Sequence, residues 1–285
     1  MVTGDGVSTG GAGAPAQQRV SRAGRNLPAA VAVGAVLGAL IICTLLFFPR
    51  GWIPIVAIAM AVASWEISGA LRSSGIQLSL VPVLLGGQAM VWLAWYRAEA
   101  ALAAFAGTVI VCMMWRLWGP KENYLRDTAI SVFVSAWVPL FGATSVLLVL
   151  QDHGAARVFC LMIGVACSDI GGYALGALFG KHPMVPAISP KKSWEGFGGS
   201  MLFGLVGGAL TLWLLLDSAP WKGLIFGAVL VVVATVGDLI ESQVKRDLGI
   251  KDMGAMLPGH GGLMDRLDSV LPSAVVAWLL LSALV

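Results

Sequence analysis

The sequence predicts an all-α, polytopic integral membrane protein, and three observations carry this prediction. Of the 285 residues, 58% are hydrophobic and only 12% are charged, whereas soluble domains carry about 25% charged residues. The mean hydropathy is +0.86. The apolar residues lie in long runs separated by short polar turns, and a membrane-spanning helix needs about 20 mainly apolar residues. We therefore expect a single transmembrane domain over residues 27–285.

Residues 1–26 differ from the rest of the chain in composition. They are rich in Gly, Ala, Ser and Gln, with Arg19, Arg22 and Arg25 scattered among them. Such a segment buries too little apolar area to order itself, so we predict a disordered cytoplasmic tail. A signal peptide is the alternative, but the apolar run that follows continues to Phe48, which is longer than a signal core of about 7 to 15 residues.

Nine apolar segments follow the tail, and we predict that each forms a transmembrane helix. They cover about residues 28–48, 52–71, 78–96, 99–118, 128–150, 156–180, 197–216, 222–240 and 268–285. Only two connections between them are long, residues 181–196 and 241–267. Small residues spaced four apart, such as Gly204 and Gly208, predict faces on which two helices approach closely in lipid.

The distribution of Lys and Arg predicts the orientation in the membrane. With nine spans and a cytoplasmic amino terminus, four of the 18 Lys and Arg residues fall on the outer side, which leaves fourteen on the cytoplasmic side. The four are Arg50, Arg97, Arg157 and Lys222. This is the bias of the positive-inside rule, and it places both long connections in the cytoplasm. The net charge of +3 is too small to indicate a nucleic-acid partner.

Three acidic residues lie within or at the ends of the predicted spans. Asp169 is near the middle of the sixth segment, where an acid costs about 2.5 to 3.5 kcal/mol on the insertion scale; a functional role and a structural role stay open for it. Glu66 is nearer the cytoplasmic end of the second segment, where a snorkelling or paired glutamate is as good an interpretation as a functional one. Asp238 ends the eighth segment. If that helix continues, its face also carries Glu241, Ser242 and Lys245.

The first long connection has groups that suit an anionic ligand. The string ISPKKSWEG, residues 188–196, places Ser189, Lys191, Lys192 and Ser193 just before a predicted helix start. Free backbone amides and the helix dipole favour phosphate at such a position. Anchoring by the positive-inside rule accounts for the two lysines equally well.

The second long connection interleaves cations with carboxylates, which membrane anchoring does not require. Asp265 and Asp268 are spaced i, i+3, so a helix would present both carboxylates on one side. Oxygen ligands of this kind suit Mg²⁺, which typically takes one or two carboxylates together with phosphate oxygens and water. The PGHGG turn, residues 258–262, removes side-chain bulk where backbone amides can reach phosphate.

The string SQVKRDLGIKDMGAMLPGHGGLMDRLDS, residues 242–269, resembles the signature of the phosphatidate cytidylyltransferases, also called CDP-diacylglycerol synthases. The family pattern is a Ser, two residues, LysArg, four residues, LysAsp, then ProxHisGlyGly and AspArgxAsp, and each fixed element is present. ISPKKSWEG resembles a second family motif. SDIGGYALGALFGKH resembles a third, in which Gly172 stands where a small residue such as Ala is usual. The resemblance covers roughly the carboxyl-terminal 120 residues.

The resemblance implies transfer of a cytidylyl group from CTP to phosphatidic acid, which gives CDP-diacylglycerol and pyrophosphate. It implies Mg²⁺ as the cofactor, leaves a second cation such as K⁺ open, and implies a homodimeric, multi-pass protein of the plasma or inner membrane. The phosphate of phosphatidic acid is already an anionic nucleophile, so no covalent intermediate is needed. Metal ions and fixed Lys or Arg side chains would neutralise and align the two polyanions.

These considerations assign candidate residues for each role, with the catalytic motifs within residues 165–270. The expected metal ligands are Asp265, Asp268 and, as a third, Asp238. The candidate catalytic residues are Lys192, Lys245, Arg246, Asp265 and Asp268. The candidate substrate-binding residues are Ser189, Lys191, Ser193, Ser242, Lys251, His260, Gly261, Gly262, Arg266 and Asp169. For His260, a general-acid role toward pyrophosphate and a purely structural role in the turn both stay open.

Two rival functions are compatible with parts of the pattern. A CTP-dependent kinase of a polyprenol or related lipid alcohol would need similar metal and phosphate groups, but it would move the γ-phosphoryl group of CTP. A transporter could use Glu66, Asp169 and Asp238 as an ion path. Transporters often have corresponding broken helices in two halves, whereas here the polar residues are concentrated in the carboxyl-terminal part.

Overall fold

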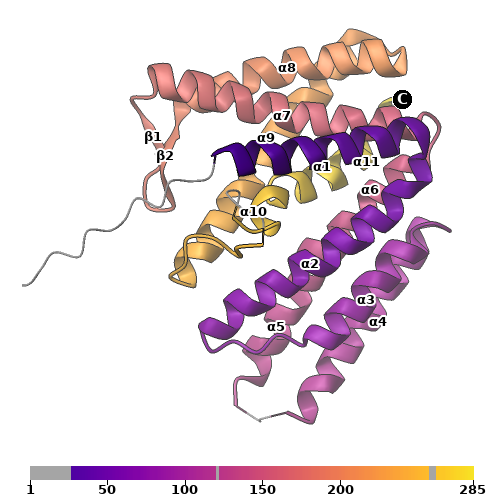
Figure 1. Cartoon of the computed structure of the whole chain (residues 1–285), viewed down its shortest axis with the longest axis vertical. Coiled ribbons are helices and arrows are strands. Elements are labelled where there is room, and N and C mark those ends of the chain that lie inside the picture. Colours follow the sequence, from indigo (N-terminus) through magenta and orange to yellow (C-terminus); the bar gives the residue numbers. More distant parts are fainter. Residues whose placement is uncertain (1–26, 120–121, 257–260) are drawn as a thin grey trace, which may run out of the picture.

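The computed structural model describes residues 27–119, 122–256 and 261–285, so the predicted tail and His260 lie outside the described residues. The chain folds as a bundle of helices with one small hairpin (Figure 1). The elements are α1 (Leu27–Phe47), η1 (Pro49–Gly51), α2 (Trp52–Ser73), α3 (Leu80–Leu93), α4 (Ala98–Leu117), α5 (Tyr124–Ser135), η2 (Ala136–Leu140), α6 (Phe141–Val149), α7 (Gly154–Phe179), β1 (Pro183–Val185), β2 (Ser189–Ser193), α8 (Trp194–Leu216), α9 (Pro220–Asp247), α10 (Met264–Leu267) and α11 (Val270–Leu284).

The predicted all-α membrane architecture is confirmed. Each of the nine predicted segments coincides with a helix or a run of consecutive helices. Seven helical stretches among the described residues are long and apolar enough to cross a membrane. The described apolar part of α1, Gly34–Phe47, is shorter, and so is α3, which has 14 residues where about 20 are needed. The number nine and the cytoplasmic amino terminus therefore stay predictions.

The fifth predicted segment is one continuous helical stretch with an irregular centre. It runs from Tyr124 to Val149, and its middle, η2, is a π-helical segment that contains Pro139. Proline has no amide hydrogen and its ring clashes with the preceding turn. A π-bulge accommodates that defect without ending the helix.

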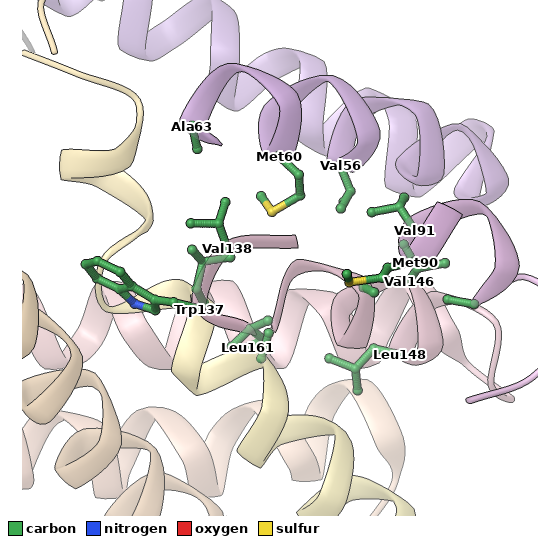
Figure 2. Packing of buried hydrophobic residues seen from close by; sticks show 14 of the residues in the cluster. Val56, Met60, Ala63, Met90, Val91, Trp137, Val138, Val146, Leu148 and Leu161 are labelled. Atoms are coloured by element: carbon green, nitrogen blue, oxygen red, sulfur yellow. The ribbon is translucent and has the colours of Figure 1, made fainter. Parts of the chain in front are cut away.

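A buried apolar cluster joins the first half of the bundle to α7. Val56 and Met60 of α2 meet Met90 of α3, Val138 of η2 and Leu161 of α7 (Figure 2). All five are at most 5% exposed. Since lipid is as apolar as these side chains, close packing holds the helices together more than hydrophobic burial does.

Glycines allow three consecutive helices, α7, α8 and α9, to pack closely. A Cβ on Gly208 of α8 would overlap the carbonyl oxygen of Gly223 of α9, and one on Gly227 would overlap that of Gly204. The predicted close face at Gly204 and Gly208 is thus the contact with α9. In Figure 1, α7 and α8 lie side by side across the top of the molecule.

The connection after α7 is a β-hairpin, which the sequence analysis treated as a loop. Strands β1 and β2 pair antiparallel, with Pro183 opposite Ser193 and Val185 opposite Ser189. The hairpin ends at the start of α8, where Ser193 is the N-cap and its hydroxyl accepts a hydrogen bond from the Gly196 amide at 3.1 Å. The two lysines of the motif therefore lie on a strand whose end is fixed to α8.

A buried ion pair ties α4 to α5. Arg116 donates to Asp127 at 2.7 Å, and the two side chains are 6% and 2% exposed. Arg126 donates to the other oxygen of Asp127 at 3.1 Å. This pair lies in the half of the chain that carries none of the predicted site residues.

Candidate active site

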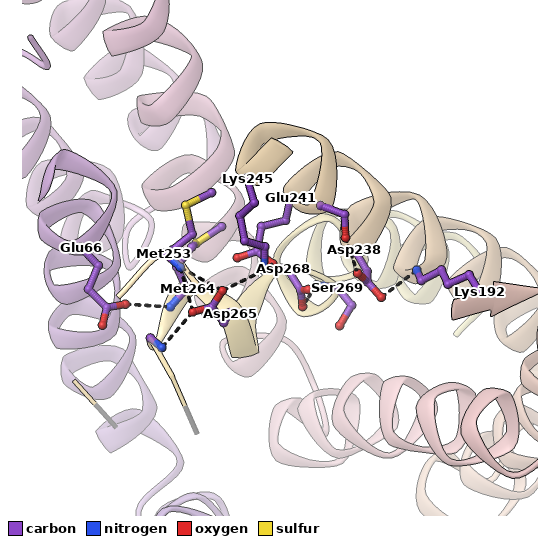
Figure 3. Close-up of polar contacts among 12 residues, drawn as sticks. Glu66, Lys192, Asp238, Glu241, Lys245, Met253, Met264, Asp265, Asp268 and Ser269 are labelled. Carbon is purple, nitrogen blue, oxygen red and sulfur yellow. Dashed lines mark hydrogen bonds and ion pairs between the residues drawn. The ribbon is translucent and has the colours of Figure 1, made fainter. Parts of the chain in front are cut away.

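The carboxyl-terminal end of α9 provides the central wall of the site. The helix continues to Asp247, well beyond the predicted end at residue 240. Asp238, Glu241, Ser242 and Lys245 therefore share one helical face. In Figure 3 this face looks toward α10 on one side and toward Lys192 of the hairpin on the other.

Lys245 is the cation at the centre of this wall. Its ammonium group lies 2.7 Å from Oε2 of Glu241 and 2.8 Å from Oδ1 of Asp265. The side chain is 17% exposed, while Glu241 is completely buried and the Asp265 side chain is 6% exposed. Two carboxylates thus hold the amine in one place, and its charge compensates theirs.

Asp265 also organises the connection between α9 and α10. Its carboxylate accepts hydrogen bonds from the backbone amides of Met253, at 3.1 Å to each oxygen, and Gly262, at 2.8 Å. A Cβ on Gly262 would lie 2.8 Å from the Gly254 nitrogen and 2.9 Å from Oδ2 of Asp265, so only glycine fits. Gly261 beside it has a φ of +85°, which glycine adopts without strain. In this structure the Gly262 amide binds Asp265, whereas the sequence analysis expected it to bind phosphate.

Asp268 lies beside the buried Glu241. One of its oxygens accepts a hydrogen bond from the Ser269 amide at 2.6 Å, and its carboxyl is in contact with that of Glu241. Oε1 of Glu241 is buried and has no hydrogen-bond donor within the part of the chain that the structure describes. Two carboxyl groups in contact without a donor need a proton or a cation between them, because each oxygen is otherwise only an acceptor.

The hairpin closes the opposite end of the wall. Lys192 forms an ion pair with Asp238 at 2.7 Å, and Asp238 accepts a hydrogen bond from the Ser242 hydroxyl at 3.3 Å. Nε of Arg246 donates to the Ile188 carbonyl at 3.2 Å. Through these contacts the first and second polar connections form one surface, as expected from the sequence.

A pocket of about 300 Å³ opens next to Lys192. Its polar lining includes Asp169, Tyr173, Lys191, Lys192, Ser200 and Asp238. Asp169 is close enough to Asp238, Asp268, Lys192 and Arg266 to interact with their charges. The third motif therefore faces the other two, and Asp169 belongs to the site surface instead of to an isolated position in the span.

The remaining predicted residues lie around this surface. Arg246, Lys251 and Arg266 are exposed, and Ser189 is partly buried. The hydroxyl of Ser193 caps α8. A substrate that contacts Ser193 would therefore have to bind a hydroxyl group that already accepts a hydrogen bond from the helix. His260 lies outside the described residues, so its two interpretations are untested.

Two glutamates belong to the site surface although neither was among the site residues predicted from the sequence. Glu241 is the residue that neutralises Lys245 from within α9. Glu66, from α2, accepts a hydrogen bond from the Met264 amide at 3.0 Å, directly before Asp265 (Figure 3). An unpaired acid in an otherwise apolar helix was a signal for Glu66, but its partner is 198 residues away in the sequence.

The acidic side chains around Lys245 are the candidate ligands of the predicted metal. No group of three or more His, Cys, Asp or Glu side chains among the described residues is already arranged around a metal position. Even so, Asp265 and Asp268 both lie beside Glu241, and no described residue donates a hydrogen bond to Oε1 of Glu241. All of these atoms are hard oxygen ligands of the kind that Mg²⁺ prefers. The chemistry of these side chains therefore fits a divalent cation, although no three of them among the described residues are placed to coordinate one.

Comparisons with known proteins place the chain in a family. Residues 28–284 match the model of the family described as "Cytidylyltransferase family". The phosphatidate cytidylyltransferase of Mycobacterium leprae is 55% identical over 280 residues, covering 92% of this chain and 90% of the relative. That of Mycobacterium tuberculosis strain H37Rv is 50% identical over 299 residues, covering 96% and 91%. The chloroplastic phosphatidate cytidylyltransferase 5 of Arabidopsis thaliana is 29% identical over 266 residues, covering 80% and 65%. The similarity thus extends well beyond the carboxyl-terminal 120 residues on which the resemblance was based.

Proposed function

This chain belongs to the cytidylyltransferase family, and we propose that it transfers the cytidylyl group of CTP to phosphatidic acid. A phosphate oxygen of phosphatidic acid attacks the α-phosphorus of CTP. The bond from that phosphorus to the oxygen bridging the α- and β-phosphates breaks. The products are CDP-diacylglycerol and pyrophosphate.

The observation that carries the proposal is the continuous polar wall from Lys192 to Asp265 at the end of a bundle of apolar helices. Lys192 pairs with Asp238, and Lys245 pairs with Asp265. The difficulty of the reaction is to bring a lipid phosphate and a triphosphate together in line. Fixed cations at the membrane surface address this difficulty by alignment and by charge neutralisation.

We assign the lipid phosphate to the 300 Å³ pocket beside Lys191 and Lys192. Tyr173, on the same pocket, is 81% exposed, so the pocket adjoins a helix face that lipid can reach. Binding of a phosphate there would draw Lys192 from Asp238 toward the ligand. Ser189 and Ser193 would add hydroxyl groups at the same end.

We assign the triphosphate to the cations of the second connection. Lys245 presents a point charge, whereas Arg246 and Arg266 can bind phosphate oxygens bidentately. Lys251, Ser242 and the glycines at positions 261 and 262 would complete the binding surface. Because Arg246 already donates to the hairpin through Nε, its outer nitrogens are the ones that would contact phosphate.

Asp265, Asp268 and Asp238 are the residues that would hold Mg²⁺, with a second cation such as K⁺ open. Mg²⁺ bound there would neutralise the triphosphate and the pyrophosphate that leaves. Chelation by EDTA is expected to abolish activity, and added Mg²⁺ is expected to restore it. Asp268→Asn should raise the Mg²⁺ concentration that gives half-maximal activity, and an unchanged Mg²⁺ dependence would refute this ligand.

The decisive experiment follows radioactive CTP in reactions of the purified protein with phosphatidic acid. Label in the α-phosphate should appear in the lipid product, and label in the γ-phosphate should appear in pyrophosphate. Transfer of the γ-label to a lipid alcohol would instead identify a kinase. Formation of neither product would refute the proposal.

We also propose that the site faces the cytoplasm and that the protein is a homodimer. The Lys and Arg distribution supports the orientation. CTP added outside inverted membrane vesicles should be used, whereas CTP outside right-side-out vesicles should not be used until they are permeabilised. Mass measurement of the protein in nanodiscs tests the dimer, and a monomer with full activity would refute it.

A further inference from the structure

A second pocket, of about 520 Å³, lies at the other end of the polar wall. It is formed by α2, the start of α3 and the connection that follows α9. Its lining includes Trp65, Glu66, Ser68, Leu80, Met253 and Met256. The two pockets thus lie at opposite ends of the series of contacts that Figure 3 shows from Glu66 to Lys192.

Glu66 is buried, and among the described residues only one of its two carboxylate oxygens receives a hydrogen bond. The residue is 5% exposed. Its Oε2 atom accepts a hydrogen bond from the Met264 amide, with the nitrogen 3.0 Å away. Oε1 is buried and has no hydrogen-bond partner in the described parts of the chain. A buried acceptor without a donor is unfavourable. A ligand in this pocket is therefore favoured if it brings an N–H or O–H group to Oε1.

The charge and the apolar surface of the lining residues indicate which kind of ligand fits this pocket. The first pocket is lined by Lys191 and Lys192, whereas this pocket has Arg72 as the single cation among its described lining residues and has Glu66 buried in its wall, so a phosphate suits it less well. Trp65, Leu80, Met253 and Met256 offer aromatic, aliphatic and thioether surface, which packs well against a flat ring. The chemistry points to a neutral heteroaromatic ring that carries a hydrogen-bond donor.

The pocket is also placed correctly for such a ring on a nucleotide. Met253 lines the pocket, and its backbone amide donates to Asp265, which contacts Lys245. A ring in the pocket therefore lies next to the residues proposed to bind the triphosphate. Arg72, on the pocket wall, adds a cation on the same side.

We infer that this pocket is the cytosine subsite and that Oε1 of Glu66 accepts a hydrogen bond from the exocyclic amino group of the base. The inference rests on the proposed function, because it takes CTP as the substrate. Uracil has a carbonyl oxygen in place of that amino group. UTP would therefore place a carbonyl oxygen, which is a hydrogen-bond acceptor, against Oε1 of Glu66, which is also an acceptor. Glu66 would thus select CTP over UTP.

Exchange of Glu66 for glutamine tests this assignment directly. In Glu66→Gln the side-chain oxygen can still accept from the Met264 amide, while the new amide nitrogen takes the place of Oε1 and is a donor instead of an acceptor. The kcat/KM for CTP should fall, that for UTP should rise, and their ratio should fall by about 100-fold or more, since sites built on such a hydrogen bond discriminate strongly. The matched control is Asp247→Asn, an exposed carboxylate at the end of α9 that accepts a hydrogen bond from Gln243, and its ratio should equal that of the wild type.

The outcomes separate a binding role from a positioning role. Equal losses of kcat/KM for CTP and UTP in Glu66→Gln would mean that Glu66 only positions Met264 and Asp265, and would overturn the inference. Unchanged values for both nucleotides would also overturn it. As a second variant, Gly254→Ala places a methyl group on Oε1 of Glu66, and it should raise the KM for CTP far more than the KM for phosphatidic acid.

A measurement on the wild-type protein covers the case in which the variants do not fold. The triphosphate of the pyrimidin-2-one ribonucleoside lacks the 4-amino group but keeps the ring. Its kcat/KM should be about 100-fold or more below that of CTP, and equal use of the two would overturn the inference. If the wild-type protein makes no CDP-diacylglycerol from CTP, the proposed function fails as well, whereas normal activity without base discrimination refutes the cytosine subsite alone.

Discussion

Replacement of Lys245 by methionine should destabilise the protein by leaving two buried carboxylates without their cation. Methionine has a similar length and no charge. Asp265 would keep its two backbone donors, Met253 and Gly262. Glu241 would keep none, because Lys245 is its only donor within the described residues and it is completely buried. Most of the cost is therefore expected at Glu241.

The magnitude follows from the two contacts of 2.7 and 2.8 Å. Opposite unit charges about 4 Å apart attract by about 4 kcal/mol at an effective dielectric constant of about 20. Desolvation of the amine offsets part of this attraction, and removal of one partner of a buried ion pair costs about 3 to 5 kcal/mol. At about 2 to 4 °C per kcal/mol, the midpoint of thermal unfolding should fall by roughly 6 to 20 °C.

Thermal unfolding of the purified protein in detergent, at a fixed protein and detergent concentration, measures this change. The double variant Lys245→Met with Glu241→Gln should recover at least half of the lost stability, because glutamine carries no charge that needs compensation. Lys251→Met, an exposed lysine in the same connection, is the matched control and should change the free energy of unfolding by less than about 0.5 kcal/mol. Additive losses in the double variant would show that packing, and not an uncompensated charge, causes the effect.

Three further predictions concern the scaffold, each measured as a change in thermal unfolding. Ser193→Ala removes the N-cap of α8 and should lower the free energy of unfolding by about 1 kcal/mol. Ser193→Asn keeps a capping oxygen and should keep most of the stability. Equal losses of stability in the two variants would argue against capping. Arg116→Leu leaves the buried Asp127 with the exposed Arg126 as its one ion-pair partner among the described residues and should cost about 3 to 5 kcal/mol. The kcat per folded molecule should stay unchanged, and a large fall in kcat would connect this pair to the site. Gly227→Ala forces α8 and α9 apart and should cost about 1 to 3 kcal/mol, but Gly198→Ala, which meets nothing within 4 Å, should not destabilise.

Local regularities in the sequence predicted the helices and one wall of the site. Long apolar runs define spans because a helix satisfies its own backbone hydrogen bonds in lipid. The spacing of Asp238 and Lys245 predicted a shared face on a continuing helix, and α9 does continue to Asp247. Lys192 and Asp238 were both assigned to the site from the sequence, and the structure brings them into contact.

Contacts between distant segments could not be predicted in this way. Glu66 has no neighbour in its own helix that identifies its partner, because the Met264 amide that binds it is a backbone group of an unrelated segment. The backbone of every residue carries such a donor, so the residue type at position 264 is no guide. Glu241 was placed on the correct face, but its burial depends on how α10 and α11 pack against α9, which its helical spacing does not determine.

The hairpin escaped prediction for a different reason. Its strands have three and five residues, and β2 contains Pro190 and two lysines, a composition that does not favour a strand. The register is set by the short turn and by the attachment of Ser193 to α8. Tertiary context therefore outweighs local propensity in this segment.

The hydrogen bond between Glu66 and the Met264 amide also bears on the order in which the protein is made. The two residues are 198 positions apart. At synthesis rates of about 5 to 20 residues per second, α2 leaves the ribosome about 10 to 40 s before its partner exists. During that interval Glu66 is a lone acid in an otherwise apolar helix, so water, the insertion machinery or a temporary neighbour has to solvate it. A nascent chain that stops before Met264 should therefore hold α2 less firmly in the bilayer than the finished protein does.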